Sequence, residues 1–194
     1  RFNGSGVIAD IVQHSNAKKY SFVRINSPPQ HLPALAKWLK FELGVNYCSM
    51  ITGTHFPEGP DDRGWEVAYH LLRQPISNQL PDTSTVYVAE NMVGSAIPVE
   101  FEIFINLPNN DSPTVPTVQH IWGGADWNEK ETWDLVGIKF EGHENMHRVL
   151  NPNDSPEGFH PLQKQHKIRY HDFNEMYDDA QGFGRKPADE GRVK

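Results

Sequence analysis

The sequence lacks several features that mark membrane proteins, secreted proteins and electron carriers. It has one cysteine, Cys48, which excludes an intrachain disulfide and cannot by itself hold an iron–sulfur cluster or a structural zinc. No run of about 18 apolar residues, the length that spans a bilayer, occurs anywhere in it. These absences predict a soluble chain in a reducing, cytoplasm-like compartment.

An excess of positive charge is also missing. The chain carries 18 Lys and Arg against 25 Asp and Glu, a formal net charge of -7. Nucleic-acid binding needs clustered cations to neutralise phosphates, so we expect no nucleic-acid partner. The 194 residues, 37% of them hydrophobic, are enough for one sizeable core. One main domain is therefore predicted.

Hydrophobic periodicity predicts one helix and a pair of strands in the first half of the chain. Residues 30–43 place apolar side chains at three- and four-residue steps, which is typical of an amphipathic helix. Residues 45–56 and 65–73 are rich in β-branched and aromatic residues, and the Pro-, Gly- and Asp-rich residues 57–64 separate them. Two strands joined by a loop are expected there.

The second half contains the clearest strand. Residues 97–107 alternate apolar and polar side chains, which predicts a strand at the centre of the sheet. Residues 75–94 are polar and irregular, and residues 115–138, rich in Trp and charge, are predicted to form an irregular helix.

These patterns indicate an α+β fold, with helices packed on a mixed β-sheet and an extended C-terminal tail. The predicted organisation is an N-terminal leader (residues 1–29), a domain (30–168) and a tail (169–194) that needs a surface to lie on, because its apolar residues are sparse. The string GSGVIA, residues 4–9, fits a dinucleotide fingerprint, but only three residues precede it where a strand is required. We interpret it as part of the leader.

The string HENMH, residues 143–147, matches the zinc-protease pattern H-E-x-x-H. In that pattern two histidines one helical turn apart bind the metal and the glutamate activates water. Gly142 before the string and Pro152 after it are poor helix context, and Leu150 and Asn153 stand where a metzincin needs Gly and His. A zinc hydrolase is the less favoured alternative.

The segment of residues 127–150, WNEKETWDLVGIKFEGHENMHRVL, resembles the signature of the 30-kDa subunit family of respiratory complex I, the NADH:quinone oxidoreductase. The family pattern is E-R-E, a following D with two apolar residues, then H and a basic residue. Matching residues are Glu129, Lys130, Glu131, Asp134, Leu135, Val136, His143, His147, Arg148, Val149 and Leu150.

The flanking sequence supports this resemblance. VPTVQHIWGGADW resembles the family's lead-in, and NPNDSPEGFHPLQK resembles its exit, which contains Pro161 and Leu162. The earlier strings NYCSMITGTHFPEG and WEVAYHLL resemble the family's strand pair. The likeness extends over residues 32–164.

Several residues depart from the family pattern. Lys130 replaces an arginine and so loses its planar, bidentate fork, Glu144 replaces a common proline, and His147 replaces a usual Lys or Arg. These differences leave the branch open. The alternatives are a membrane-bound hydrogenase and a deazaflavin- or ferredoxin-linked complex.

The resemblance implies a non-catalytic structural subunit of the peripheral electron-transfer arm, in the quinone module of a proton-translocating NADH:quinone oxidoreductase. It implies no cofactor in this subunit, and iron–sulfur clusters, flavin and quinone in partner subunits. The implied partners are the hydrogenase-like large subunit of the quinone module and iron–sulfur subunits. It also implies a peripheral position on the cytoplasmic side of the cell membrane, or the matrix side in mitochondria, with membrane contact only through the complex.

The charges of the signature also have an interpretation that is independent of family. On a helix Glu131 and Asp134 share a face and Glu129 is turned away. Carboxylates beside tryptophans are costly to bury unless they are paired, and Arg148 and Lys139 are the internal cations available. A solvated acidic face stays an open alternative. We assign no catalytic, cofactor-binding or metal residue, and expect interface or structural roles for Glu129, Glu131, Asp134, His143, Arg148, Pro161 and Leu162.

A free-standing adaptor domain is the remaining alternative. It would be a folded monomer with no dehydrogenase partners, whereas a zinc hydrolase would need a helical HENMH and stoichiometric metal. What co-purifies with the chain separates these classes.

Overall fold

The computed structural model describes residues 2–15, 21–74 and 98–166. The chain divides into two compact units, Arg1–Lys164 and Gln165–Lys194, and the fold below is that of the first. The predicted tail and the polar stretch of residues 75–94 lie outside the described residues.

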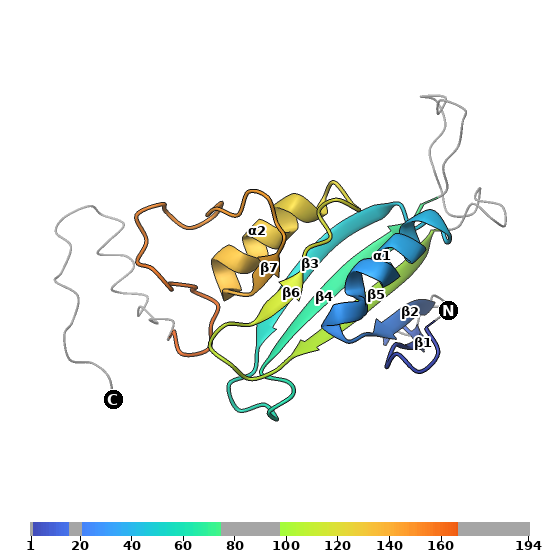
Figure 1. Cartoon of the computed structure of the whole chain (residues 1–194), viewed down its shortest axis with the longest axis horizontal. Coiled ribbons are helices and arrows are strands. Elements are labelled where there is room, and N and C mark those ends of the chain that lie inside the picture. The colour runs from blue at the N-terminus through green and yellow to red at the C-terminus, as the bar shows by residue number, and fades with distance from the viewer. Residues whose placement is uncertain (1, 16–20, 75–97, 167–194) are drawn as a thin grey trace. The chain divides into compact units, whose positions relative to one another are not determined.

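The described helices and strands of the first unit are short (Figure 1). In chain order they are β1 (Ile8–Gln13), β2 (Ser21–Asn26), the 3-10 turn η1 (Pro29–His31), α1 (Leu32–Phe41), β3 (Tyr47–His55), β4 (Trp65–Arg73), β5 (Val99–Leu107), β6 (Thr114–Pro116), α2 (Ala125–Val136) and β7 (Lys139–Glu141).

Five strands form one mixed sheet in the order β1-β2-β5-β4-β3. The pair β2 and β5 is parallel and the other three pairs are antiparallel. Strand β5 is therefore the middle strand, as the alternation of residues 97–107 predicted. A separate parallel pair, β6 and β7, lies in the segment around α2. The α+β prediction is confirmed.

The alternation in β4 and β5 decides which face of the sheet is buried. Trp65, Val67, Tyr69 and Leu71 are buried on β4, and the odd-numbered residues 101–107 are buried on β5. The residues between them are partly or fully exposed. Because side chains of a strand point alternately to the two faces, one face carries the core.

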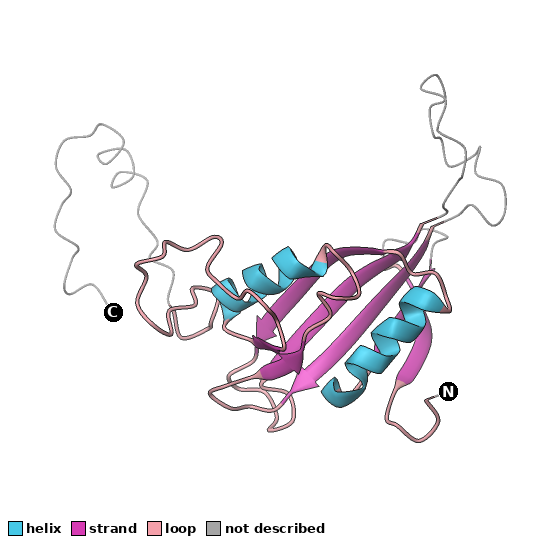
Figure 2. Ribbon diagram, turned by 45° about the horizontal axis from the view of Figure 1, so that its top comes forward, coloured by secondary structure: helices cyan, strands magenta, loops and turns pink. Residues whose placement is uncertain are grey.

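Both helices cover that buried face (Figure 2). Helix α1 contributes Leu32, Leu35, Ala36 and Leu39, which are buried in the same core as the strands. Helix α2 lies over β3, where a side chain at Gly53 would collide with the Thr132 methyl group at 2.9 Å. None of the described helices is both long enough and apolar enough to cross a bilayer.

The strands β1 and β2 lie in residues 1–29, where the sequence predicted a leader. Strand β2 sits beside the central strand β5, with Ile25 opposite Ile103 and buried. Residues 21–26 are thus part of the sheet, because their apolar side chains complete its core face. The GSGVIA string forms a turn and the start of β1, and β1 leads to a strand instead of a helix, so it is not a dinucleotide loop.

The predicted helix over residues 115–138 is shorter than expected. Thr114–Pro116 forms β6, which pairs with β7, and α2 begins only at Ala125. Pro116 lacks an N–H, and two consecutive glycines, Gly123 and Gly124, precede the helix, so helical hydrogen bonding does not extend back to residue 115. The other predicted helix and strands are confirmed, with ends shifted by a few residues.

Candidate functional site

Helix α2 buries polar and charged side chains to an unusual extent. Glu129 and Asp134 have no exposed surface, and Lys130 and Thr132 are 5% and 4% exposed. Buried charge is costly unless it is paired or hydrogen-bonded, so both carboxylates need partners within the fold. Glu129, Asp134 and their direct partners together form what we call the acidic network.

Asp134 is held by donors from the segment that follows β7. The Arg148 guanidinium lies 2.8 Å from Oδ1, and the backbone N–H groups of Val149, Leu150 and Asn151 donate to Oδ2 at 3.1, 2.9 and 2.8 Å. The Asn151 side chain donates to Oδ1 at 2.9 Å. Burial alone would raise the pKa of Asp134, but the hydrogen bonds from Asn151, Leu150 and Val149 place it well below its usual range.

Arg148 connects Asp134 to a later part of the chain. Its guanidinium also donates to the carbonyl oxygens of Phe159 at 3.0 Å and Pro156 at 3.1 Å. It lies 5.7 Å from the centre of the Trp133 ring, a cation–π distance. One side chain therefore fixes residues 148–159 against α2.

Glu129 faces the loop that precedes α2. The Thr117 hydroxyl donates to Oε2, and the Val118 backbone N–H donates to Oε1 at 2.7 Å. Burial raises the pKa of Glu129 to about 7, and the negative charge of Asp126 adds to this, whereas the two hydrogen bonds act in the opposite direction. Glu129 and Asp134 thus have opposite pKa shifts.

His143 lies beside Glu129 with its side chain fully buried. The backbone N–H of Asn145 donates to Nδ1 at 3.2 Å, so the neutral ring carries its hydrogen on Nε2. Nε2 lies 3.3 Å from a carboxylate oxygen of Asp126 and 3.9 Å from Oε2 of Glu129. The signature histidine therefore links the segment after β7 to the first turns of α2.

The HENMH string is not helical. Its residues form turns and loop after β7, and His147 contacts the Asn145 carbonyl oxygen, at 3.0 Å, through Nδ1. Within the described part of the chain no group of three or more His, Cys, Asp or Glu could hold a metal ion. The helical geometry on which the zinc-protease alternative depended is absent at this string.

The exit segment caps the C-terminal end of α2. The carbonyl oxygens of Asp134, Leu135 and Val136 would have no partner within the helix. The His160 ring contacts the first at 3.0 Å, the Leu162 N–H donates to the second at 2.9 Å, and the Gln163 side chain donates to the third at 2.8 Å. The predicted exit turn therefore closes the helix.

Glu131 differs from the other two carboxylates. It is partly exposed and accepts a hydrogen bond of 2.8 Å from the indole N–H of Trp127, whose side chain is 53% exposed. The prediction placed Glu131 and Asp134 on one face of the helix and Glu129 on another. These faces do not decide which of the three side chains is buried. Thr117 and Val118 cover α2 on one side and residues 148–163 cover it on another, so Glu129 and Asp134 are both enclosed.

Of the two predicted cations, Arg148 pairs with Asp134, whereas Lys139 is exposed on β7. Lys130 pairs instead with Asp126, at 2.9 Å. Sequence reasoning missed Thr117 and Asn151, which have no charge to mark them. Their signal was position: one precedes the acidic segment and the other follows Arg148 by three residues.

Three comparisons bear on this chain. Residues 25–172 match the family model described as the 30-kDa subunit of respiratory-chain NADH dehydrogenase. The C subunit of an NADH-quinone oxidoreductase from Moorella thermoacetica is 32% identical over 142 residues, covering 73% of this chain and 78% of that protein. The J subunit of an NAD(P)H-quinone oxidoreductase from a Synechococcus strain is 35% identical over 147 residues, covering 76% and 69%.

Two solved structures share the fold. A trypsin-resistant fragment of Nqo5 has a TM-score of 0.50 and 24% identity, over 71% of this chain and 89% of the fragment. A chain in the membrane-bound sulfane sulfur reductase, an archaeal respiratory membrane complex, has a TM-score of 0.58 and 18% identity, over 94% and 88%.

Proposed function

The chain belongs to the family of the 30-kDa subunit of respiratory-chain NADH dehydrogenase, and we propose that it is a non-catalytic structural subunit of the quinone module of such a complex. The observation that carries this proposal is the family match over residues 25–172, which spans most of the folded unit. Relatives 32% and 35% identical are named as subunits of quinone oxidoreductases.

The acidic network supports a structural role. Both of its carboxyl groups are bonded within the fold: Asp134 to Arg148 and three backbone amides, and Glu129 to the Thr117 hydroxyl and the Val118 amide. Groups satisfied in this way hold α2, the loop before it and the exit segment in one arrangement. Their role is to position the surface around them.

That surface is apolar where the network fixes the backbone. Leu150 donates its N–H to Asp134 while its side chain is 55% exposed, and Leu162 donates to the Leu135 carbonyl while its side chain is 56% exposed. Trp127, on α2, is 53% exposed. Exposed large apolar side chains held by a rigid backbone suit an interface with another protein. We therefore propose Leu162 as an interface residue. Glu131 is proposed as another, because it is bonded to the exposed Trp127.

The proposed partners follow from the family. They are the hydrogenase-like large subunit of the quinone module and the iron–sulfur subunits of the same complex. The iron–sulfur clusters, flavin and quinone are proposed to reside in those partners. The position proposed for the chain is peripheral, on the cytoplasmic side of the membrane or the matrix side in mitochondria.

Mass spectrometry of what co-purifies with the full chain in mild detergent, with metal analysis of the same sample, tests the proposal. Recovery of a hydrogenase-like large subunit and iron–sulfur subunits, with iron in the sample, is expected. A solitary chain with one equivalent of zinc would contradict it in favour of a hydrolase, and a metal-free monomer in favour of an adaptor. Recovery of the subunits of a membrane-bound hydrogenase, or of a deazaflavin-oxidising complex, would instead assign the chain to another branch of the family.

A matched pair of variants tests the interface. Leu162→Asp should reduce recovery of the partner subunits, because the charge would have to be buried against them. Gln30→Asp, which introduces the same carboxylate at an exposed polar position of η1, serves as the control and should leave recovery unchanged. Equal recovery with both variants would remove Leu162 from the interface.

A further inference from the structure

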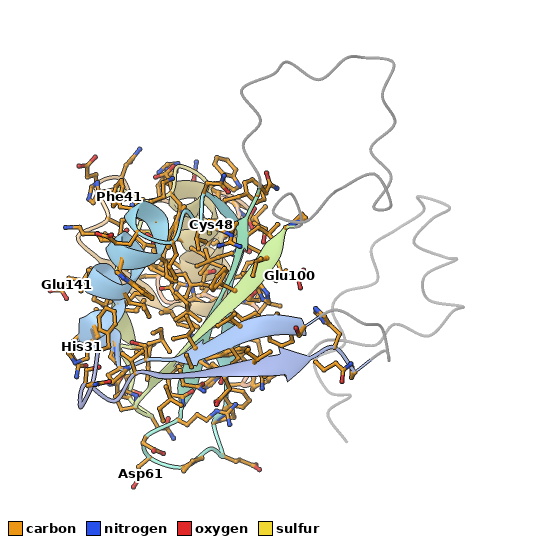
Figure 3. All side chains as sticks on the ribbon, turned by 90° about the vertical axis from the view of Figure 1, so that its right-hand side faces the viewer. His31, Phe41, Cys48, Asp61, Glu100 and Glu141 are labelled. Atoms are coloured by element: carbon orange, nitrogen blue, oxygen red, sulfur yellow. The ribbon has the colours of Figure 1, made fainter. Side chains whose placement is uncertain are left out.

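Among the residues that the structure describes, strand β1 is an edge strand with no strand paired on its outer side. Among the described strands it pairs only with β2, through six consecutive residue pairs from Ile8↔Asn26 to Gln13↔Ser21 (Figures 1 and 3). Five of its six residues are exposed, with Ile8 58% and Ile11 80% accessible. Alternate backbone N–H and C=O groups of such a strand point away from β2. They form a template for another strand.

The opposite edge of the sheet is protected in two ways that β1 lacks. Strand β3 has a register irregularity between Cys48 and Met50, which interrupts a regular ladder. Helix α2 also covers it, with the Thr132 hydroxyl bonded to the Ile51 carbonyl at 2.9 Å. Strand β1 has an uninterrupted register, no proline, no lysine and no arginine. Natural edge strands normally carry such blocking features when they face water.

Two rows of side chains run across the sheet and end at β1. On the core face the row reads Ile11, Val23, Phe101, Leu71 and Cys48, in register across all five strands. Phe101, Leu71 and Cys48 are buried, whereas Ile11 is 80% exposed. The apolar row is therefore unfinished at β1. A residue opposite Ile11 on an added strand would be apolar.

The neighbouring row on the other face begins with three charged residues of alternating sign. It reads Asp10, Arg24, Glu102, His70 and Met50. Arg24 lies 4.0 Å from Glu102, and His70 lies 3.4 Å from Glu102. Asp10 ends the row and is the one charged residue of β1. A cation opposite Asp10 on an added strand would continue the alternation and gain a favourable cross-strand pair.

We propose that β1 accepts an extended segment of another subunit of the complex as a sixth strand of this sheet. The recognised chemistry is an unpaired backbone edge, an apolar residue opposite Ile11 and a lysine or arginine opposite Asp10. Strand addition of this kind takes affinity from the backbone and specificity from alternate side chains. The inference rests on the proposed function, because that function supplies the partner polypeptide.

A second copy of the chain fits this edge less well. A two-fold axis perpendicular to the sheet must place residues of one face opposite residues of the same face. If residues 8–12 of the two copies pair in antiparallel register, Asp10 of one copy lies opposite Asp10 of the other, which is repulsive. If residues 9–13 of the two copies pair instead, Asp10 of one copy lies opposite Val12 of the other. Neither supplies the missing cation.

Amide hydrogen exchange at single-residue resolution tests the proposal on the full chain alone and in the isolated complex. In the chain alone, alternate amides of residues 8–13 should exchange rapidly, because only every second amide is bonded to β2. In the complex this rapid set should slow by at least about tenfold. Unchanged exchange of that set in an intact complex would overturn the strand addition while leaving the proposed function standing. Failure to recover any complex would contradict the proposed function itself.

Two further measurements identify the occupant. A photo-reactive residue in place of Gln13, at the exposed end of β1, should cross-link to another subunit of the complex. Cross-links only to a second copy or to this chain would overturn the proposal. The variant Asp10→Lys should lower recovery of that subunit by roughly two- to fivefold. The control Asp62→Lys, in the exposed loop before β4, should not lower it, and equal recovery from the two variants would remove Asp10 from the contact.

Discussion

Asp134 is the residue on which the arrangement around α2 depends most. It has no exposed surface, yet it stays ionised because Arg148, Asn151 and three backbone N–H groups surround it. Hydrogen bonds from that many donors offset the free-energy cost of removing the carboxylate from water. Removing its charge leaves the guanidinium of Arg148 without an anion in a mostly buried place.

Asp134→Asn is therefore expected to lower the free energy of unfolding by about 3–5 kcal/mol. Urea denaturation followed by fluorescence of the nearby tryptophans measures the change. Asp62→Asn, on an exposed loop, is the matched control and should stay within about 0.5 kcal/mol of the unmodified protein. A loss at position 134 no larger than that of the control would show that the network contributes little.

Glu131 leads to a contrasting expectation, because its only described partner is the exposed indole of Trp127. Glu131→Gln keeps an acceptor for that N–H and should leave the free energy of unfolding within about 0.5 kcal/mol. Loss of the charge is expected to lower assembly or activity of the complex, measured by subunit recovery and quinone reductase rate. A fully assembled and active complex would contradict an interface role.

At the scale of elements, the C-terminal end of α2 depends on one backbone conformation. Gly137 has a φ of +90°, and its N–H donates to the Trp133 carbonyl at 2.8 Å. A Cβ atom there would lie 2.7 Å from Nε2 of Gln163 and 2.8 Å from Cδ2 of His160. Those are two of the groups that satisfy the final carbonyls of the helix. Helix end and exit segment are thus one structural unit.

Gly137→Ala should lower the free energy of unfolding by about 1–3 kcal/mol, because it combines left-handed strain with a collision. It should also make residues 148–163 more sensitive to limited proteolysis than the rest of the domain. Gly123→Ala, where an added Cβ would contact nothing and φ is ordinary, is the control and should show neither effect. Equal proteolysis of the two variants would argue against coupling of the exit segment to α2.

At the scale of the whole molecule, Glu129 and Asp134 give the stability opposite dependences on pH. The pKa of Glu129 is raised to about 7 in the folded state, so its contribution is complete below its unfolded value near 4.5 and is lost as pH rises through 7. The pKa of Asp134 is lowered, so its contribution is present above its unfolded value near 3.8 and is lost as pH falls further. Stability from this pair is greatest between the two ranges.

Glu129→Gln should remove the first of these dependences. Between pH 4.5 and pH 8, the free energy of unfolding of the unmodified protein should fall relative to the variant by about 3 kcal/mol, the equivalent of the pKa shift. Urea denaturation of both proteins across this range measures the difference. Parallel curves would show that Glu129 does not titrate there.

The sequence by itself determined α1, β3, β4, β5 and the family. The alternation in residues 65–73 and 97–107 and the helical spacing in residues 30–43 predicted β4, β5 and α1, because burial on one face leaves a period that can be read directly. The signature around Glu129, Asp134 and Arg148 indicated the family, since it holds many residues at fixed spacing. Charge also indicated Arg148 as one of two candidate partners for a buried carboxylate, with Lys139 as the other, and only the structure chose between them.

Only the tertiary structure decided which elements meet and which acids are enclosed. Strands β1 and β2 join the sheet through β5, which follows them in the chain only after α1, β3 and β4, and no local pattern specifies that pairing. Glu129 is buried and Glu131 is not because Thr117 and Val118 cover one side of α2, whereas periodicity shows only how residues are spaced around a helix. The open edge at β1 is likewise a property of strand order, which is set by long-range packing.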